Sequence, residues 1–127
     1  MPSQDPGRRL RDILEHISLV RAWTEGMSLE EFAQDTRTRY AVQMALMVMG
    51  EAAEALPPEL HERHPDVHWR GLADIGNTFR HQYWAVEHQI TWAGLQKELD
   101  PLENAVRAEL ASLAGEGSLR SSPKGGS

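Results

Sequence analysis

Histidine and tryptophan are concentrated in residues 61–92, which hold five of the six His and three of the four Trp. In this stretch His81 directly follows Arg80, with Asn77 four residues before it and Tyr83 two residues after it. An imidazole, with an ordinary pKa of about 6.5, can take up and return a proton at neutral pH. A guanidinium can hold a phosphate and stabilise the charge that develops on it. These groups suffice for metal-free cleavage of RNA, in which a 2′-hydroxyl attacks the adjacent phosphate, whereas DNA lacks that nucleophile.

A helix is predicted to carry these residues, beginning at Pro65 and Asp66 and running to about Trp84. Its apolar residues recur at helical spacing and should face the core: Trp69, Leu72, Ile75, Phe79, Tyr83 and Val86. Gly71 and Gly76 each cost such a helix about 1 kcal/mol relative to Ala, so a neighbour should need their small size. Either close packing against another helix or access for RNA or a partner fits that requirement.

His81 projects away from this apolar stripe, because each residue turns the helix by about 100°. It shares a polar line with Asn77 and Asp74. Arg70 lies on the same line but about 16 Å from His81 along the helix axis. The alternative for His81 is a solvated histidine without a function. Tyr83 falls on the core side, so its alternative is a buried, hydrogen-bonded phenol.

Two further helices are predicted before this one. The first carries an amphipathic stripe and ends near Gly26; the stripe is Leu10, Ile13, Leu14, Ile17, Val20 and Trp23. Ser28 and Glu31 form a capping box, and the helix that starts there should run to about Leu56, where two prolines stop it.

The middle of this second helix, AVQMALMVMG at residues 41–50, is apolar on nearly all sides. Such a helix needs cover on two faces. One face can pack within the bundle, and a Met-rich second face favours a second subunit. We therefore expect a homodimer, with burial inside one chain as the alternative.

Two more helices complete the prediction. One covers about 87–98, and Asp100, Pro101 and Glu103 provide the cap, the first-turn proline and the capping-box acid of the other. The last helix should end at Gly115 and bury four residues: Leu102, Val106, Leu110 and Leu113.

These helices predict a single all-α domain. It is a bundle of about five helices over residues 8–114, with flexible termini at 1–7 and 115–127. The 127 residues include no Cys, which excludes disulfide scaffolds and thiol chemistry. No apolar run approaches the ~18 residues of a membrane span, so we expect a soluble cytoplasmic protein with no membrane partner.

Charge and metal-binding residue types limit the partners further. Thirteen basic and nineteen acidic residues give a net charge of −6, so the molecule as a whole repels a phosphate backbone and any contact with RNA must be local. His61, His64 and His68 are close enough in sequence to suggest a metal site, but Pro65 keeps them from sharing one helical face. We predict no metal and no other cofactor.

Two segments resemble a known family. WRGLADIGNTFRHQYWAVEHQITW and FAQDTRTRYAVQMALMVMGEAAEALP are similar to the corresponding segments of HepT-like toxins, which belong to the HEPN superfamily, and the resemblance spans about residues 10–110. It implies an up-and-down HEPN-like bundle that is dimeric and cuts RNA without metal. It also implies a neighbouring MNT-type nucleotidyltransferase antitoxin, which in some systems transfers AMP to the motif tyrosine (AMPylation).

The family motif is an Arg, four to six residues, a His, any residue and a Tyr. By this resemblance the His and Tyr correspond to His81 and Tyr83, and the Asn that often follows the Arg corresponds to Asn77. The Arg has no counterpart, since residues 74–76 are Asp, Ile and Gly. This departure puts the source of the cation in doubt.

Arg80 can replace the missing cation, because it lies one helical turn after Gly76, which leaves room for the side chain. The other sources are Arg70 and the partner subunit, and the alternative is that activity is weakened or lost. Glu51 and Asp35 can orient the arginines of the site, or can be ordinary solvated helix acids.

The predicted function is that of a metal-independent endoribonuclease toxin in a type II-like toxin–antitoxin pair, neutralised by an MNT-type nucleotidyltransferase. His81, Arg80 and Asn77 would be catalytic, Tyr83 would be the site of modification or antitoxin contact, and RNA would be the substrate. The main alternative is an inactive HEPN binding module that pairs with a nucleotidyltransferase, favoured by the absent motif Arg and the acidic net charge. A plain structural dimer is a third possibility.

Overall fold

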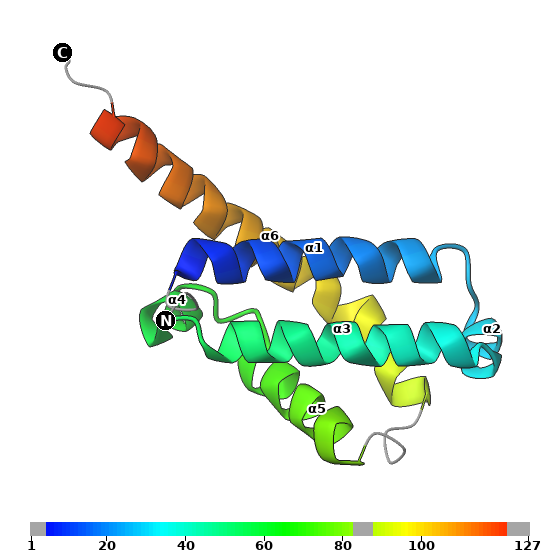
Figure 1. Ribbon diagram of the computed structural model, residues 1–127. Helices are drawn as coiled ribbons and strands as arrows, with labels where there is room; N and C mark the ends of the chain where they lie inside the picture. Colours follow the sequence, from blue (N-terminus) through cyan, green and yellow to red (C-terminus); the bar gives the residue numbers. More distant parts are fainter. Residues whose placement is uncertain (1–4, 83–87, 122–127) are drawn as a thin grey trace.

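The structure, a computed structural model, describes the backbone of residues 5–82 and 88–121, and their side chains except those of 76, 77, 79–82 and 116–121. This part of the chain forms six α-helices and no strand: α1 (Pro6–Thr24), α2 (Leu29–Gln34), α3 (Thr36–Glu54), α4 (Pro58–Arg63), α5 (Trp69–Gln82) and α6 (His88–Ser121). Figure 1 shows α1 and α3 running antiparallel, with α5 below α3 and α6 crossing behind them. The all-α prediction is confirmed, with six helices where about five were expected.

The interface between α1 and α3 forms the centre of the core. Four residues of the predicted α1 stripe are buried there and at most 1% exposed: Leu10, Ile13, Ile17 and Val20. Leu14 is only partly buried, and Trp23, at 38% exposed, does not belong to the core as predicted. The helix begins where the Asp5 carboxylate accepts a hydrogen bond from the Gly7 amide at 3.0 Å. It ends before Gly26, whose φ of 75° is the left-handed conformation that Gly adopts after a helix.

The predicted helix from Ser28 to Leu56 is wrong in one respect, because the chain breaks it at Asp35. The capping box is confirmed: the Ser28 amide donates to Glu31 at 2.8 Å, and the Glu31 amide donates to Ser28 Oγ at 3.1 Å. Asp35 then adopts an extended conformation and caps α3. The break turns Phe32 into the core, where its ring packs against Trp92 at a centroid distance of 5.1 Å.

The segment after α3 also differs from the prediction. The prolines after Glu54 end α3 as expected, but residues 58–63 form the short helix α4, which buries Leu60. α5 begins at Trp69 rather than at Pro65, because residues 64–68 form a turn that places Val67 in the core.

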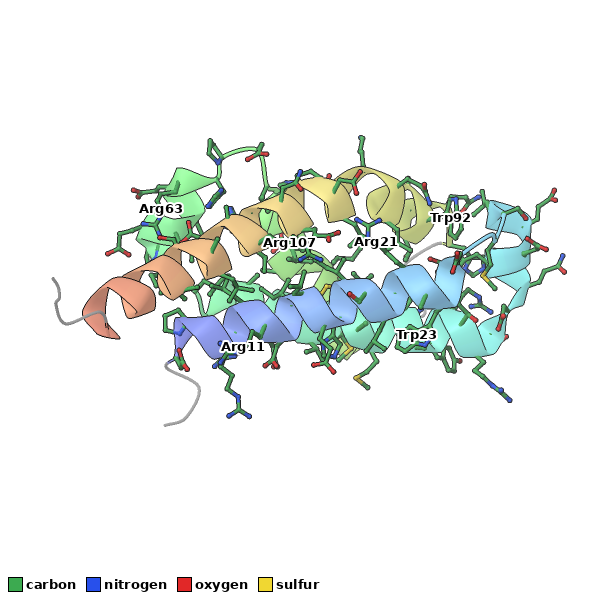
Figure 2. The ribbon with its side chains drawn as sticks, turned by 90° about the horizontal axis from the view of Figure 1, so that it is seen from above. Arg11, Arg21, Trp23, Arg63, Trp92 and Arg107 are labelled. Atoms are coloured by element: carbon green, nitrogen blue, oxygen red, sulfur yellow. The ribbon has the colours of Figure 1, made fainter. Side chains whose placement is uncertain are left out.

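A single helix, α6, replaces the two predicted helices on either side of Pro101. The ring removes one backbone hydrogen bond. Asp100 and Glu103, expected to cap a new helix, instead bind Arg21 of α1 at 2.7 and 3.1 Å, so α1 stabilises both sides of the proline. Figure 2 shows Arg21 pointing from α1 to α6, near Arg107.

The C-terminal end of α6 extends further than predicted. The helix continues past Gly115, which shows no left-handed φ. Leu102 and Val106 are buried as predicted and Leu110 is partly buried, but Leu113 is 39% exposed because the last turns extend beyond α1 (Figure 1). Within the described residues no helix is both long and apolar enough to cross a bilayer.

Candidate functional site

α5 carries the predicted catalytic positions. The helix is continuous from Trp69 to Gln82, so backbone positions Asn77 and His81 lie one turn apart, near its end. Arg80 and Gly76 belong to the same two turns. The side chains of these four residues lie outside the described part of the structure, and so does the whole of Tyr83. Their chemical roles therefore stay predictions.

The first half of the polar line on α5 is described in full. Arg70 Nε lies 3.7 Å from Asp74 Oδ1, and both side chains are exposed. The Thr78 hydroxyl donates to the Asp74 carbonyl at 3.0 Å. The cation at Arg70 is thus oriented toward Asp74, one turn along the helix, and stays about 16 Å from position 81 along the axis.

Asp35 and Glu51, predicted to support the site, both lie at or on α3. Asp35 Oδ1 accepts a hydrogen bond from the Thr38 amide at 3.0 Å, and this bond lowers the pKa of Asp35, with the Thr38 side chain and nearby arginines contributing in the same direction. Its observed role is to cap α3. Glu51 is exposed, in the last turn of the helix.

The histidines before α5 make structural contacts. The His61 ring stacks on Trp69 with 4.5 Å between ring centroids, and its Nε2 bonds to the Ala53 carbonyl at 2.8 Å. The His68 ring packs against Gly71, where an added Cβ would lie 2.6 Å from it. Across the described residues, no three His, Asp or Glu side chains come together in an arrangement that could hold a metal ion.

A nearly buried carboxylate joins α4 to α6. Glu109 accepts two hydrogen bonds from Arg63, at 3.0 and 2.8 Å, and its Oε2 lies 2.7 Å from His64 Nε2. Figure 2 shows Arg63 at α4, facing this part of α6. The Arg63 bonds hold the pKa of Glu109 below its ordinary value, against the effect of burial, and His64 contributes in the same direction. The Trp69 indole donates to the His64 carbonyl at 3.0 Å, which ties the start of α5 to the same cluster.

Sequence reasoning missed Glu109, although a signal was present. Glu109 lies three residues after Val106 and directly before Leu110, inside the apolar stripe of α6. An acid on a core-facing stripe indicates a charged or polar partner. Glu109 has two, His64, which is largely buried, and Arg63, which is half-exposed.

A pocket of about 280 Å³ separates α5 from the first half of α6. α5 packs mainly on α3 and α6 mainly on α1, which leaves this space between them. Buried leucines form its floor: Leu46, Leu95, Leu99 and Leu102. Gly71, Leu72 and Ile75 line one wall, and Ile90 and Gly94 line the other. Gly71 therefore adjoins the pocket, and the atoms nearest to it belong to the His68 ring.

Comparison with known proteins gives consistent matches. Residues 13–109 match the family described as "Ribonuclease HepT-like". A Methanocaldococcus jannaschii protein named "Putative RNase" is 35% identical over 72% of this chain and 76% of its own length. A Thermococcus cleftensis protein named "Probable ribonuclease HepT" is 31% identical over 74% of this chain and 86% of its own. A second M. jannaschii "Putative RNase" is 29% identical over 91% of this chain and 95% of its own. No solved structure matches significantly.

Proposed function

This chain belongs to the HepT-like ribonuclease family, and we propose that it cleaves RNA without a metal ion as the toxin of a toxin–antitoxin pair. The observation that carries the proposal is the family match over residues 13–109, which includes α5 and the His81–x–Tyr83 part of the motif. The relatives named as ribonucleases match over most of their own length, which favours the same activity here.

In the proposed reaction, His81 removes the proton from a ribose 2′-hydroxyl. The 2′-oxygen forms a bond to the adjacent phosphorus as the bond from phosphorus to the 5′-oxygen breaks. The protonated imidazole returns its proton to the 5′-oxygen. The products are a 2′,3′-cyclic phosphate and a 5′-hydroxyl, and the chemistry requires no metal ion.

Arg80 binds the phosphate and stabilises the charge that develops on it, and Asn77 donates a hydrogen bond that orients the phosphate. Two observations support Arg80 over Arg70 as the cation. Arg70 already faces Asp74 at 3.7 Å, and it lies about 16 Å along the axis from position 81, whereas Arg80 is adjacent to His81. Glu51 and Asp35 support the site by orienting the arginines of α3 and α5.

The protein acts as a homodimer in this proposal. Tyr40 and Met44 on α3 are 54% and 59% exposed. They lie one turn apart on the side of the helix opposite Val42 and Met49, which are fully buried. Exposed aromatic and Met side chains at helical spacing are typical of a protein–protein contact, so this face of α3 is the proposed subunit interface.

An MNT-type nucleotidyltransferase is the proposed antitoxin, with transfer of AMP to Tyr83 as the route of inactivation. Incubation of the purified protein with its candidate partner and ATP tests this: we expect a mass increase of one AMP group that the Tyr83→Phe variant does not show. Unchanged mass together with no complex between the two proteins would contradict the proposal.

A cleavage assay tests the central activity. Purified protein is incubated with mixed-sequence RNA and with DNA of the same sequence, each with and without EDTA. We expect RNA to be cut equally in both conditions, to give 5′-hydroxyl ends, and DNA to stay intact. Cleavage that EDTA abolishes would show that the mechanism is wrong.

A second candidate function is a non-catalytic module that binds a nucleotidyltransferase. Its specific support is the absence of Arg at residues 74–76 and the net charge of −6. An intact RNA after prolonged incubation, combined with a stable complex with the partner, would favour this module over the ribonuclease.

A further inference from the structure

The pocket between α5 and α6 is large enough to hold a flat, two-ring group. Its volume is about 280 Å³, and a core cavity of about 150 Å³ already binds benzene. On one wall the His68 ring covers Gly71, and on the other Gly94 presents backbone in place of a side chain, where a Cβ would meet no atom within 4 Å. Leu72 and Ile75 offer apolar contacts to the faces of a ring.

One end of the pocket carries a carboxylate that can bind a ligand. Glu98 lines the pocket and is half-buried. Glu103 and Glu109, on the same helix, are held by arginines, whereas no hydrogen bond or ion pair within the described part of the chain engages Glu98. An ionised carboxylate only accepts hydrogen bonds, so a group that binds there must present donors.

We infer that this pocket binds a guanine base of the RNA substrate, with Glu98 accepting hydrogen bonds from N1–H and from the 2-amino group. Guanine has two donors side by side on one edge, which match the two oxygens of one carboxylate. Adenine and cytosine place an acceptor beside their amino group, and uracil places carbonyl oxygens on both sides of its single N–H. The other three bases would therefore each bring an oxygen or nitrogen lone pair toward Glu98.

This inference rests on the proposed ribonuclease function, because the guanine is part of the RNA substrate. The pocket and the predicted catalytic position share one helix, and Ile75 lies six residues before His81. That spacing is about 9 Å along the axis, or roughly three base steps of 3.4 Å. Proteins read single-stranded RNA by receiving splayed bases in pockets of this kind. The guanine would lie within a few nucleotides of the cut.

Mapping of cut ends on a mixed-sequence RNA provides the first test. The parent protein should show guanine enriched at one fixed distance from the cut. Glu98→Gln should reduce that enrichment about tenfold, because an amide replaces one acceptor with a donor. Glu59→Gln is the matched control, since it removes the same charge from an exposed position on α4 and should keep the enrichment. Cleavage by the parent with no base preference would overturn the inference and leave the ribonuclease proposal intact.

A binding measurement separates the two proposals. The parent is titrated with GMP and with UMP by calorimetry, and neither nucleotide contains a bond that it could cleave. We expect GMP to bind about tenfold more tightly than UMP, with the difference lost in Glu98→Gln and GMP binding lost in Gly94→Leu, which fills the pocket. Binding of GMP by a protein that cuts no RNA would support the pocket and reject the ribonuclease. Equal binding of the two nucleotides would overturn the guanine site. The guanine site would also be overturned if Gly94→Leu kept the base preference but no longer bound a protein partner, because the pocket would then bind a protein and not a base.

Discussion

The α1–α3 interface and the α5–α6 pocket are built from similar aliphatic residues but bury them to different extents. At the first, Ile13 and Val42 are 0% exposed; at the second, Ile75 is only half-buried and Ile90 is 60% exposed. Apolar burial stabilises a fold by about 25 cal/mol per Å². The first interface therefore provides much of the stability, whereas part of the apolar surface at the second stays exposed and does not stabilise the fold. The difference indicates that the contact between α1 and α3 is the scaffold of the fold, while the space between α5 and α6 is available to a ligand.

The largest expected effect is at the catalytic position of α5. His81→Ala should lower RNA cleavage by ~10²–10⁴-fold, because general acid–base catalysis contributes that much. The melting temperature should stay near that of the parent, because Ala suits a helix. His88→Ala, at the exposed first residue of α6, is the control and should cleave normally. Parental cleavage by His81→Ala would remove the catalytic assignment.

Substitution of one isoleucine in each region tests the difference in burial directly. Ile13→Ala should lower the free energy of unfolding by about 2–5 kcal/mol, since it leaves a cavity in the core. Ile90→Ala should change it by no more than about 0.5 kcal/mol, because its side chain is mostly in water. Urea denaturation of both variants measures these values. A similar loss in both would mean that Ile90 is covered, for instance by a second subunit.

Glu109 lies outside both regions, where it joins α4 to α6, and its removal should have an intermediate effect. Glu109→Gln should destabilise the fold by about 1–2 kcal/mol at pH 7, a value reduced by the exposure of Arg63. In the folded protein the pKa of Glu109 is lowered from its ordinary value of 4.5. The parent's advantage should therefore be complete above that value and disappear as the pH falls through the lower, folded pKa. Denaturation curves at a series of pH values from 7 downwards measure it, and an advantage that does not decrease as the pH falls below 4.5 would contradict the role of the charge.

Local signals in the sequence predicted helix boundaries where the interacting residues are close in sequence, and failed where they are not. The Ser28 capping box was predicted correctly because both of its bonds join residues three apart. The Asp35 break was missed because a carboxylate that caps one helix looks the same as one exposed on a longer helix. Pro101 was interpreted as a helix start, since its tolerance inside α6 depends on Arg21, 80 residues away in sequence.

For the site, the sequence assigned the chemistry to one helix, an assignment that stays a prediction, but it did not predict the pocket beside that helix. The roles of His81 and Tyr83 were predicted from their residue types and from the resemblance to the family motif. The pocket depends on how α5 and α6 diverge from α3, which no spacing within α5 records. Gly71 was the one partial signal, because its cost to a helix pointed to a use for the small residue.

The smallest expected effect is that of Arg70→Gln, which is compared with Arg80→Gln on the same helix. Arg70→Gln should hardly change stability, because the ion pair with Asp74 is exposed on both sides. It should also leave cleavage near the parental rate, while Arg80→Gln should reduce cleavage about as strongly as loss of His81. Measurement of kcat and KM on one short RNA compares the two variants, with the salt concentration held constant because phosphate contacts depend on it. If Arg70→Gln is the variant that loses kcat, the cation missing from residues 74–76 is supplied from the start of α5, and the RNA must then lie along the whole polar line of the helix.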